Sequence, residues 1–269
     1  MRLRIAHSTV HRYDPPATGV IQVLRLTPRN HDGQYVMRWR IDVSADARLA
    51  GHEDAFGNLT HVFSADGPFE ELTVEVDGEV ETQNTNGIVR GAVERFPPTL
   101  FLRETSVTQA DAAIRDFAQG IRAGGGGEIL AELHALLERL HDDAEGENDG
   151  RTPQAAAAAT EAFASKSTGP RDLTHVFISA ARCLNIPARY VSGYVCSDHA
   201  VEQQNSHAWA EAFVPDLGWV GFDPTVGACP TEAYVRLAVG LDALGAAPFR
   251  GTRYGSGEET LAVAIRVDQ

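Results

Sequence analysis

The sequence is short of cysteine and of basic residues, and each shortage narrows the classes of protein to which it can belong. Its three cysteines, Cys183, Cys196 and Cys229, are too few and too scattered for a disulfide framework or a zinc site. Lys and Arg number 23 against 37 Asp and Glu, which gives a net charge of −14. Because nucleic acids and anionic membranes are bound through basic patches, this charge excludes both as partners.

Long apolar runs are missing as well. No run approaches the roughly 18 residues that suggest a membrane span. The first residues lack the apolar core of a signal peptide. The glycine run 124–127 is not followed by the Lys-Ser/Thr of a phosphate-binding loop, so we interpret it as a linker. These absences predict a cytoplasmic protein with no cofactor, no metal and no membrane association.

The composition itself is that of a soluble globular protein, with 43% hydrophobic and 22% charged residues. A chain of 269 residues can form one large domain or two ordinary ones. Residues 1–103 contain alternating apolar runs such as 37–43, separated by turn signals such as 14–16 and 77–78. Regular short strands with such turns predict a β-sandwich-like N-terminal domain.

Helical periodicity follows in residues 104–166, which we assign to a helical connector. Thr108 is expected to cap its first helix, with Asp111 three residues later. Thr152-Pro153 is typical of the start of another helix, which is rich in alanine. Since the connector joins a strand-rich region to a mixed one, the predicted fold class is α+β.

Residues 167–269 mix helical and strand periodicity and form the predicted C-terminal core domain. A helix is expected from about Pro170 to Leu184, followed by strands at roughly 188–195, 206–214 and 218–223. If the turn between the last two strands centres on Asp216, the residues on either side of it face each other in register.

On such a hairpin, His207 and Trp209 share a face with Asp223, and His207 lies one diagonal step from the carboxylate. An imidazole and a carboxylate at that separation can form the orienting hydrogen bond of a nucleophile–base–orienter triad. The nucleophile of such a triad belongs at a helix N-terminus, where the dipole stabilises a thiolate. In this sequence that place is taken by Pro170, which has no nucleophilic atom.

Several stretches resemble the transglutaminase-like proteins of bacteria, within the papain-like cysteine peptidase superfamily. They are 184–194 (LNIPARYVSGY), 206–213 (SHAWAEAF) and 218–225 (GWVGFDPT). Upstream, 24–29 (LRLTPR) and 54–58 (DAFGN) resemble the β-rich N-terminal domain that usually accompanies these proteins, and 251–255 (GTRYG) resembles their C-terminus. The likeness covers nearly the whole chain and implies a papain-like C-terminal domain.

The resemblance implies a Cys–His–Asp triad at Pro170, His207 and Asp223. The family usually reads Gly-x-Cys-Arg/Gln-Asp-x-x-His at the helix start, and residues 169–175 (GPRDLTH) align with it without a gap. The family also places Trp209 beside its site, so Trp209 is a candidate substrate-binding residue, although packing is the commoner role for such a tryptophan. The sequence departs from the family pattern at Val226, and similarly at 241 and 243.

Three functional hypotheses follow. The first is a non-catalytic member that binds peptide or protein amide groups in a cleft, or that partners an active paralogue. The second is an active amide hydrolase or acyltransferase with another nucleophile, such as Cys196 in the loop before His207, or Ser167 or Thr168. The third is that Pro170 is an introduced change that silenced a normal enzyme, which a Pro170→Cys protein would test.

Overall fold

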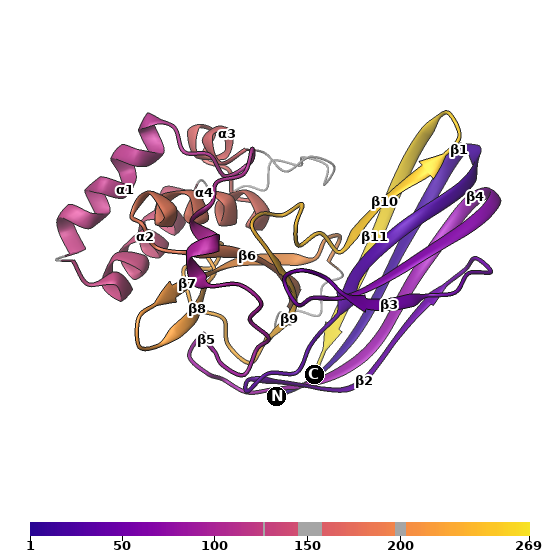
Figure 1. Cartoon of the computed structure of the whole chain (residues 1–269), viewed down its shortest axis with the longest axis horizontal. Coiled ribbons are helices and arrows are strands. Elements are labelled where there is room, and N and C mark those ends of the chain that lie inside the picture. The colour runs from indigo at the N-terminus through magenta and orange to yellow at the C-terminus, as the bar shows by residue number, and fades with distance from the viewer. Residues whose placement is uncertain (126, 145–157, 197–202) are drawn as a thin grey trace.

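The computed structural model describes residues 1–125, 127–144, 158–196 and 203–269, and it confirms the α+β class. A six-stranded sheet and a five-stranded sheet lie beside each other, and the α-helices lie over one face of the smaller sheet (Figure 1). None of the described helices is long and apolar enough to cross a membrane.

The larger sheet is built on two long antiparallel strands. Its members are β1 (Arg2–Thr27), β2 (Gln34–Val43), β3 (Ala50–Glu53), β4 (Leu59–Thr82), β10 (Phe249–Tyr254) and β11 (Glu258–Asp268). Register shifts between Arg12 and Gly19 interrupt the β1–β4 ladder, and such bulges bend strands. Both arms of the bent sheet contribute to one apolar cluster, for example through Leu24 and Val74, so the arms pack face to face in two layers.

The strands are fewer and longer than the sequence predicts. The turn signals at 14–16 and 77–78 both lie inside strands, in β1 and β4. At Gly78 the reason is packing, because the indole of Trp39 lies so close that an added Cβ would sit 2.1 Å from it. Glycine there makes room for a cross-strand aromatic neighbour and does not form a turn.

The helical elements are η1 (Pro98–Leu102), α1 (Ala112–Gly125), α2 (Ile129–Asp143), α3 (Ala159–Ala164) and α4 (Pro170–Cys183). The predicted cap of α1 at Thr108 is wrong. The carboxylate of Asp111 accepts the backbone N–H of Ile114 at 2.9 Å, and Thr108 instead accepts a hydrogen bond from Arg182. The start of the alanine-rich helix predicted at Thr152-Pro153 lies outside the described residues.

The smaller sheet has the order β5-β8-β7-β6-β9 and supports α4. Its strands are β5 (Ile88–Val89), β6 (Ala188–Val195), β7 (His207–Val214), β8 (Gly218–Phe222) and β9 (Tyr234–Gly240). The alanines of β7 at 208, 210 and 212 face the apolar cluster that includes α4. The other face of β7 carries His207, Trp209 and Glu211, because side chains alternate along a strand.

The predicted domain boundaries at residues 103 and 167 do not coincide with the division of the strands between the two sheets. Strands β10 and β11 come after the core strands, yet both pair with β1 in the larger sheet. Conversely, β5 precedes residue 103 and pairs with β8 in the smaller one. The pairing of β10 and β11 with β1 joins segments far apart in the chain, which sequence periodicity alone does not reveal.

Candidate functional site

The hairpin of β7 and β8 has the register that the sequence predicts. Ala210 pairs with Phe222 and Val214 with Gly218, so the turn centres on Asp216. Asp216 has a φ of 68° and Gly218 a φ of 90°, left-handed conformations that aspartate tolerates and glycine favours. This turn places Asp223 just beyond the end of β8, on the face of the hairpin that carries His207.

His207 and Asp223 form the hydrogen bond expected of them. The distance between His207 Nε2 and Asp223 Oδ2 is 2.5 Å, and the two side chains are 10% and 0% exposed. Asp223 also accepts the hydroxyl of Tyr234 at 2.8 Å and the backbone N–H of Thr225 at 2.9 Å. Burial alone would raise the pKa of Asp223, but its bonds with His207, Tyr234 and Thr225 lower it, so the carboxylate stays ionised.

The imidazole of His207 is oriented on both sides by aromatic rings. The ring of Trp209 is stacked at 6.4 Å and that of Tyr234 lies edge-on at 5.8 Å. In the neutral ring, Nε2 donates to Asp223 and Nδ1 is left as a proton acceptor. This is the arrangement that a general base needs, since one nitrogen is fixed by a carboxylate and the other is available.

Helix α4 is directed so that its first residue points toward the His207 end of the sheet. Near its C-terminus, Arg182 donates to the carbonyl of Ala188, the first residue of β6, at 2.9 Å. Nearer its N-terminus, the ring of His175 lies 5.3 Å from that of Tyr190. Helix α4 and strand β6 therefore run antiparallel to each other.

Further along β6, Gly193 pairs with His207 across the ladder. The N-terminus of α4 is thus directed at the place where His207 and Asp223 meet. Pro170 is the first residue of α4, after the extended N-cap residue Gly169. Its ring suits the first turn of a helix and its carbonyl accepts the hydroxyl of Thr174 at 2.6 Å, but its side chain has no group that could attack a carbonyl.

Comparisons with known proteins find two matched regions in this chain. The family model of the bacterial transglutaminase-like N-terminal region matches residues 3–81, and that of the transglutaminase-like superfamily matches residues 115–224. The second match includes Pro170, His207 and Asp223. The chain belongs to the transglutaminase-like superfamily.

Two relatives of this transglutaminase-like protein match along nearly its whole length. An uncharacterized protein of Mycobacterium leprae is 27% identical over 99% of this chain and 98% of its own. An uncharacterized protein of Mycobacterium tuberculosis is 24% identical over 99% and 92%. A candidate cysteine protease from Cytophaga hutchinsonii has a crystal structure that superposes with a TM-score of 0.77 at 17% identity, over 100% of this chain and 90% of that one. That likeness shows a shared fold.

Trp209, the candidate substrate-binding residue, is 2% exposed in the transglutaminase-like core. Its ring covers Gly193, where an added Cβ would lie 2.5 Å away, and it packs with Val191 and Val239. Its indole also contacts the ring of Tyr234 edge-on at 5.4 Å. Trp209 therefore supports the residues around His207, and a contact with substrate stays a prediction.

Cys196 follows β6, and its thiol lies 3.5 Å from the carbonyl of Val267 in β11. Its backbone N–H continues the ladder by donating to Ala233 at 2.9 Å. Because Cys196 comes three residues after Gly193, the partner of His207, strand alternation turns its side chain to the opposite face. The geometry does not favour a reaction between this thiol and His207.

Tyr234 is the site residue that sequence reasoning missed. It lies on β9, two strands away from β7, and no spacing or motif links it to Asp223. Burial and the adjacent carboxylate of Asp223 raise the pKa of Tyr234, so its hydroxyl keeps its proton and donates. Only the folded sheet brings this donor to the His–Asp pair.

A Tyr234→Phe variant is expected to lose about 1.5–3 kcal/mol of the free energy of unfolding, the usual contribution of a hydrogen bond to a charged group. Urea unfolding at pH 7 measures the loss. Tyr254→Phe is the matched control, since Tyr254 is 53% exposed on β10, and it should change stability by less than about 0.5 kcal/mol. Equal stability of the two variants would refute the role given to Tyr234.

A buried ion network lies on the face of β7 that also carries His207 and Trp209. Glu211 is 0% exposed and accepts hydrogen bonds at 2.7 Å from both Arg189 and Arg236. Arg189 also binds both carboxylate oxygens of Glu94, and its guanidinium lies 3.9 Å from the ring centre of Trp219. Burial alone would raise the pKa of Glu211, but the charges of Arg236 and Arg189 lower it to about 2.

Proposed function

We propose that this transglutaminase-like protein lacks the nucleophile of its family and works as a non-catalytic binding or partner protein. One observation carries the proposal. The base and its orienting carboxylate, His207 and Asp223, are hydrogen-bonded at 2.5 Å, while the helix start directed at them holds Pro170. Acyl transfer by the family's mechanism needs a thiolate at that place, and proline cannot supply one.

The surroundings of the pair support a retained binding role. Asp223 keeps three hydrogen-bond donors, and His207 keeps two aromatic neighbours, so the machinery around the absent thiol is ordered. We propose that this site receives a peptide or an amide-bearing side chain, or that the protein associates with an active relative. Nucleic acid and membrane are not proposed as partners, and we place the protein in the cytoplasm.

The assay for this proposal measures ammonia release and amine incorporation with a glutamine-containing peptide. The purified protein is expected to show no rate above buffer, and His207→Ala is expected to be indistinguishable from it. A clear rate in the natural protein that disappears in His207→Ala would overturn the proposal. Such a rate, together with His207-dependent alkylation of Cys196 by iodoacetamide, would establish the alternative enzyme.

A further inference from the structure

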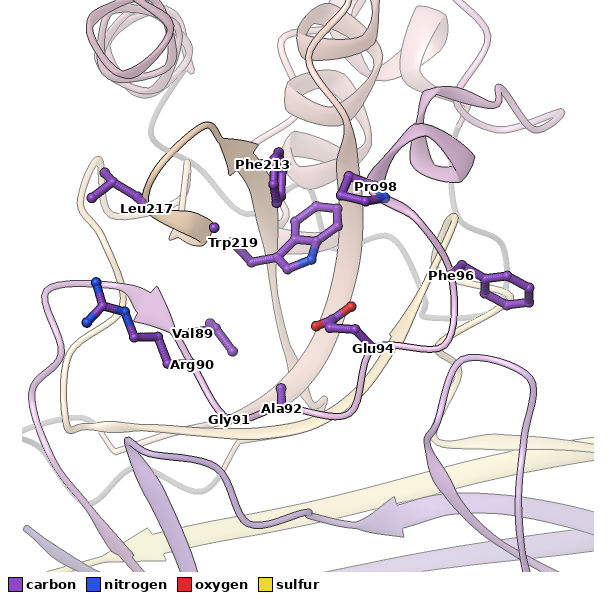
Figure 2. A pocket seen from close by; sticks show the side chains of 11 residues that line it. Val89, Arg90, Gly91, Ala92, Glu94, Phe96, Pro98, Phe213, Leu217 and Trp219 are labelled. Carbon is purple, nitrogen blue, oxygen red and sulfur yellow. The ribbon is translucent and has the colours of Figure 1, made fainter.

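A cavity of about 330 Å³ lies at the start of β8, the end remote from Asp223. It is bounded by the turn between β7 and β8 and by the segment that follows β5 (Figure 2). Its apolar lining consists of Val89, Phe96, Pro98, Phe213, Leu217 and Trp219. Small-molecule sites are concave, mostly apolar and of roughly 300–1,000 Å³, so this cavity has a suitable size and character.

The lining contains two charged residues, and the negative charge of one of them, Glu94, is compensated by an ion pair. Both of its carboxylate oxygens accept hydrogen bonds from Arg189, at 2.7 and 2.9 Å. Arg189 shares Glu211 with Arg236, so two carboxylates and two guanidiniums balance within the network. Glu94 therefore offers the cavity oriented acceptor oxygens without adding a net negative charge.

The other charged lining group, Arg90, is not compensated. It is exposed to solvent, and its guanidinium makes no ion pair or hydrogen bond with a side chain in the parts of the chain that the structure describes. The carboxylate of Asp32 lies against Gly91, close to this segment, but forms no ion pair with Arg90. Figure 2 shows the side chains of Arg90 and Glu94 on opposite sides of the lining, with Val89 between them.

We propose that this cavity binds a small carboxylic acid with an apolar or aromatic body. The body contacts Phe213, Trp219 and Val89, while the carboxylate pairs with the guanidinium of Arg90, whose planar fork matches carboxylate geometry. The site is separate from His207 and Asp223, so its existence does not depend on the function proposed above.

Three probes that differ only in their head group test the assignment: 4-phenylbutyrate, 4-phenylbutylamine and 4-phenylbutanol. Binding is followed by the NMR signals of the indole N–H groups, of which the protein has three, assigned by Trp→Phe variants. We expect 4-phenylbutyrate to shift the Trp219 signal and to bind at least about tenfold more tightly than the amine or the alcohol, the effect of one charge-assisted hydrogen bond. Equal or tighter binding of the amine, or shifts confined to Trp39 and Trp209, would overturn the proposal.

Variants of the lining complete the test. Arg90→Ala should weaken 4-phenylbutyrate binding about tenfold, and Ala92→Phe, which fills the cavity from its wall, should abolish it. Arg250→Ala removes an exposed arginine from β10 and should leave the affinity unchanged. Unaltered amide spectra outside the cavity confirm folding of each variant. Tighter binding of N-acetyl-glycyl-phenylalanine than of 4-phenylbutyrate would support the same carboxylate site and identify its ligand as a peptide C-terminus.

Discussion

A Pro170→Cys variant is expected to be alkylated by iodoacetamide at pH 6 about tenfold faster than an ordinary exposed cysteine. The N-terminus of α4 and the imidazole of His207 both stabilise a thiolate, and such surroundings lower a thiol pKa from about 8.5 to 7 or less. A shift of about two units raises the thiolate fraction nearly a hundredfold. About a tenfold advantage survives, because nucleophilicity falls as the pKa falls.

Stopped-flow or mass-spectrometric alkylation rates measure this effect against two controls. Ala262→Cys places a thiol on the exposed strand β11, and its rate gives the ordinary value. The double variant Pro170→Cys/His207→Ala should lose most of the advantage, because the imidazole is absent. Equal rates for Pro170→Cys and Ala262→Cys would show that position 170 is not the family's nucleophile position. Amide turnover by Pro170→Cys would show, in addition, that the remaining machinery is intact.

The second large effect is on stability. A Glu211→Ala variant is expected to lose about 3–5 kcal/mol of the free energy of unfolding, because it leaves the two interior guanidiniums of Arg189 and Arg236 with one carboxylate, Glu94, and Arg236 without its partner. Urea unfolding at pH 7 measures the loss. Glu138→Ala removes an exposed carboxylate from α2 and should cost less than about 0.5 kcal/mol. A comparable loss in both variants would mean that the network does not stabilise the fold.

The same carboxylate predicts a pH dependence of stability. The pKa of Glu211 lies near 2 in the folded protein, below its ordinary value of 4.5. A carboxylate whose pKa is lower in the folded than in the unfolded protein stabilises the fold fully at pH values above its unfolded-state pKa. This stabilisation is lost as the pH falls from about 4.5 toward 2. The natural protein should therefore lose more stability than Glu211→Ala across that interval.

Features that depend on local patterns could be predicted from the sequence. The register of the β7–β8 hairpin follows from alternation and from the turn at Asp216, so the contact between His207 and Asp223 was accessible before the fold was known. The fold class followed from the change of periodicity along the chain. The Pro170 position was accessible because a motif aligns around it, and its catalytic equivalence stays a prediction.

Features that depend on distant pairing could not be predicted. Tyr234 reaches Asp223 only through the order of strands in the smaller sheet. Gly78 has the signature of a turn but lies in β4 beneath Trp39, since tertiary packing overrides local preference. The cavity beside Trp219 likewise needs β5 and β8 to meet, and these strands are some 130 residues apart in the chain.

The return of β10 and β11 to β1 has a consequence for how the protein is made. Arg4 pairs with Asp268, so the outermost ladder of the larger sheet joins residues from both ends of the chain, which lie side by side in Figure 1. During synthesis, the first arm of β1 emerges from the ribosome long before its partner β11 exists. Contacts of such high sequence separation form late and slowly, which leaves that edge of β1 unpaired until β11 has been synthesised. A protein with this topology depends on a nascent-chain environment that keeps an unpaired strand edge from aggregating.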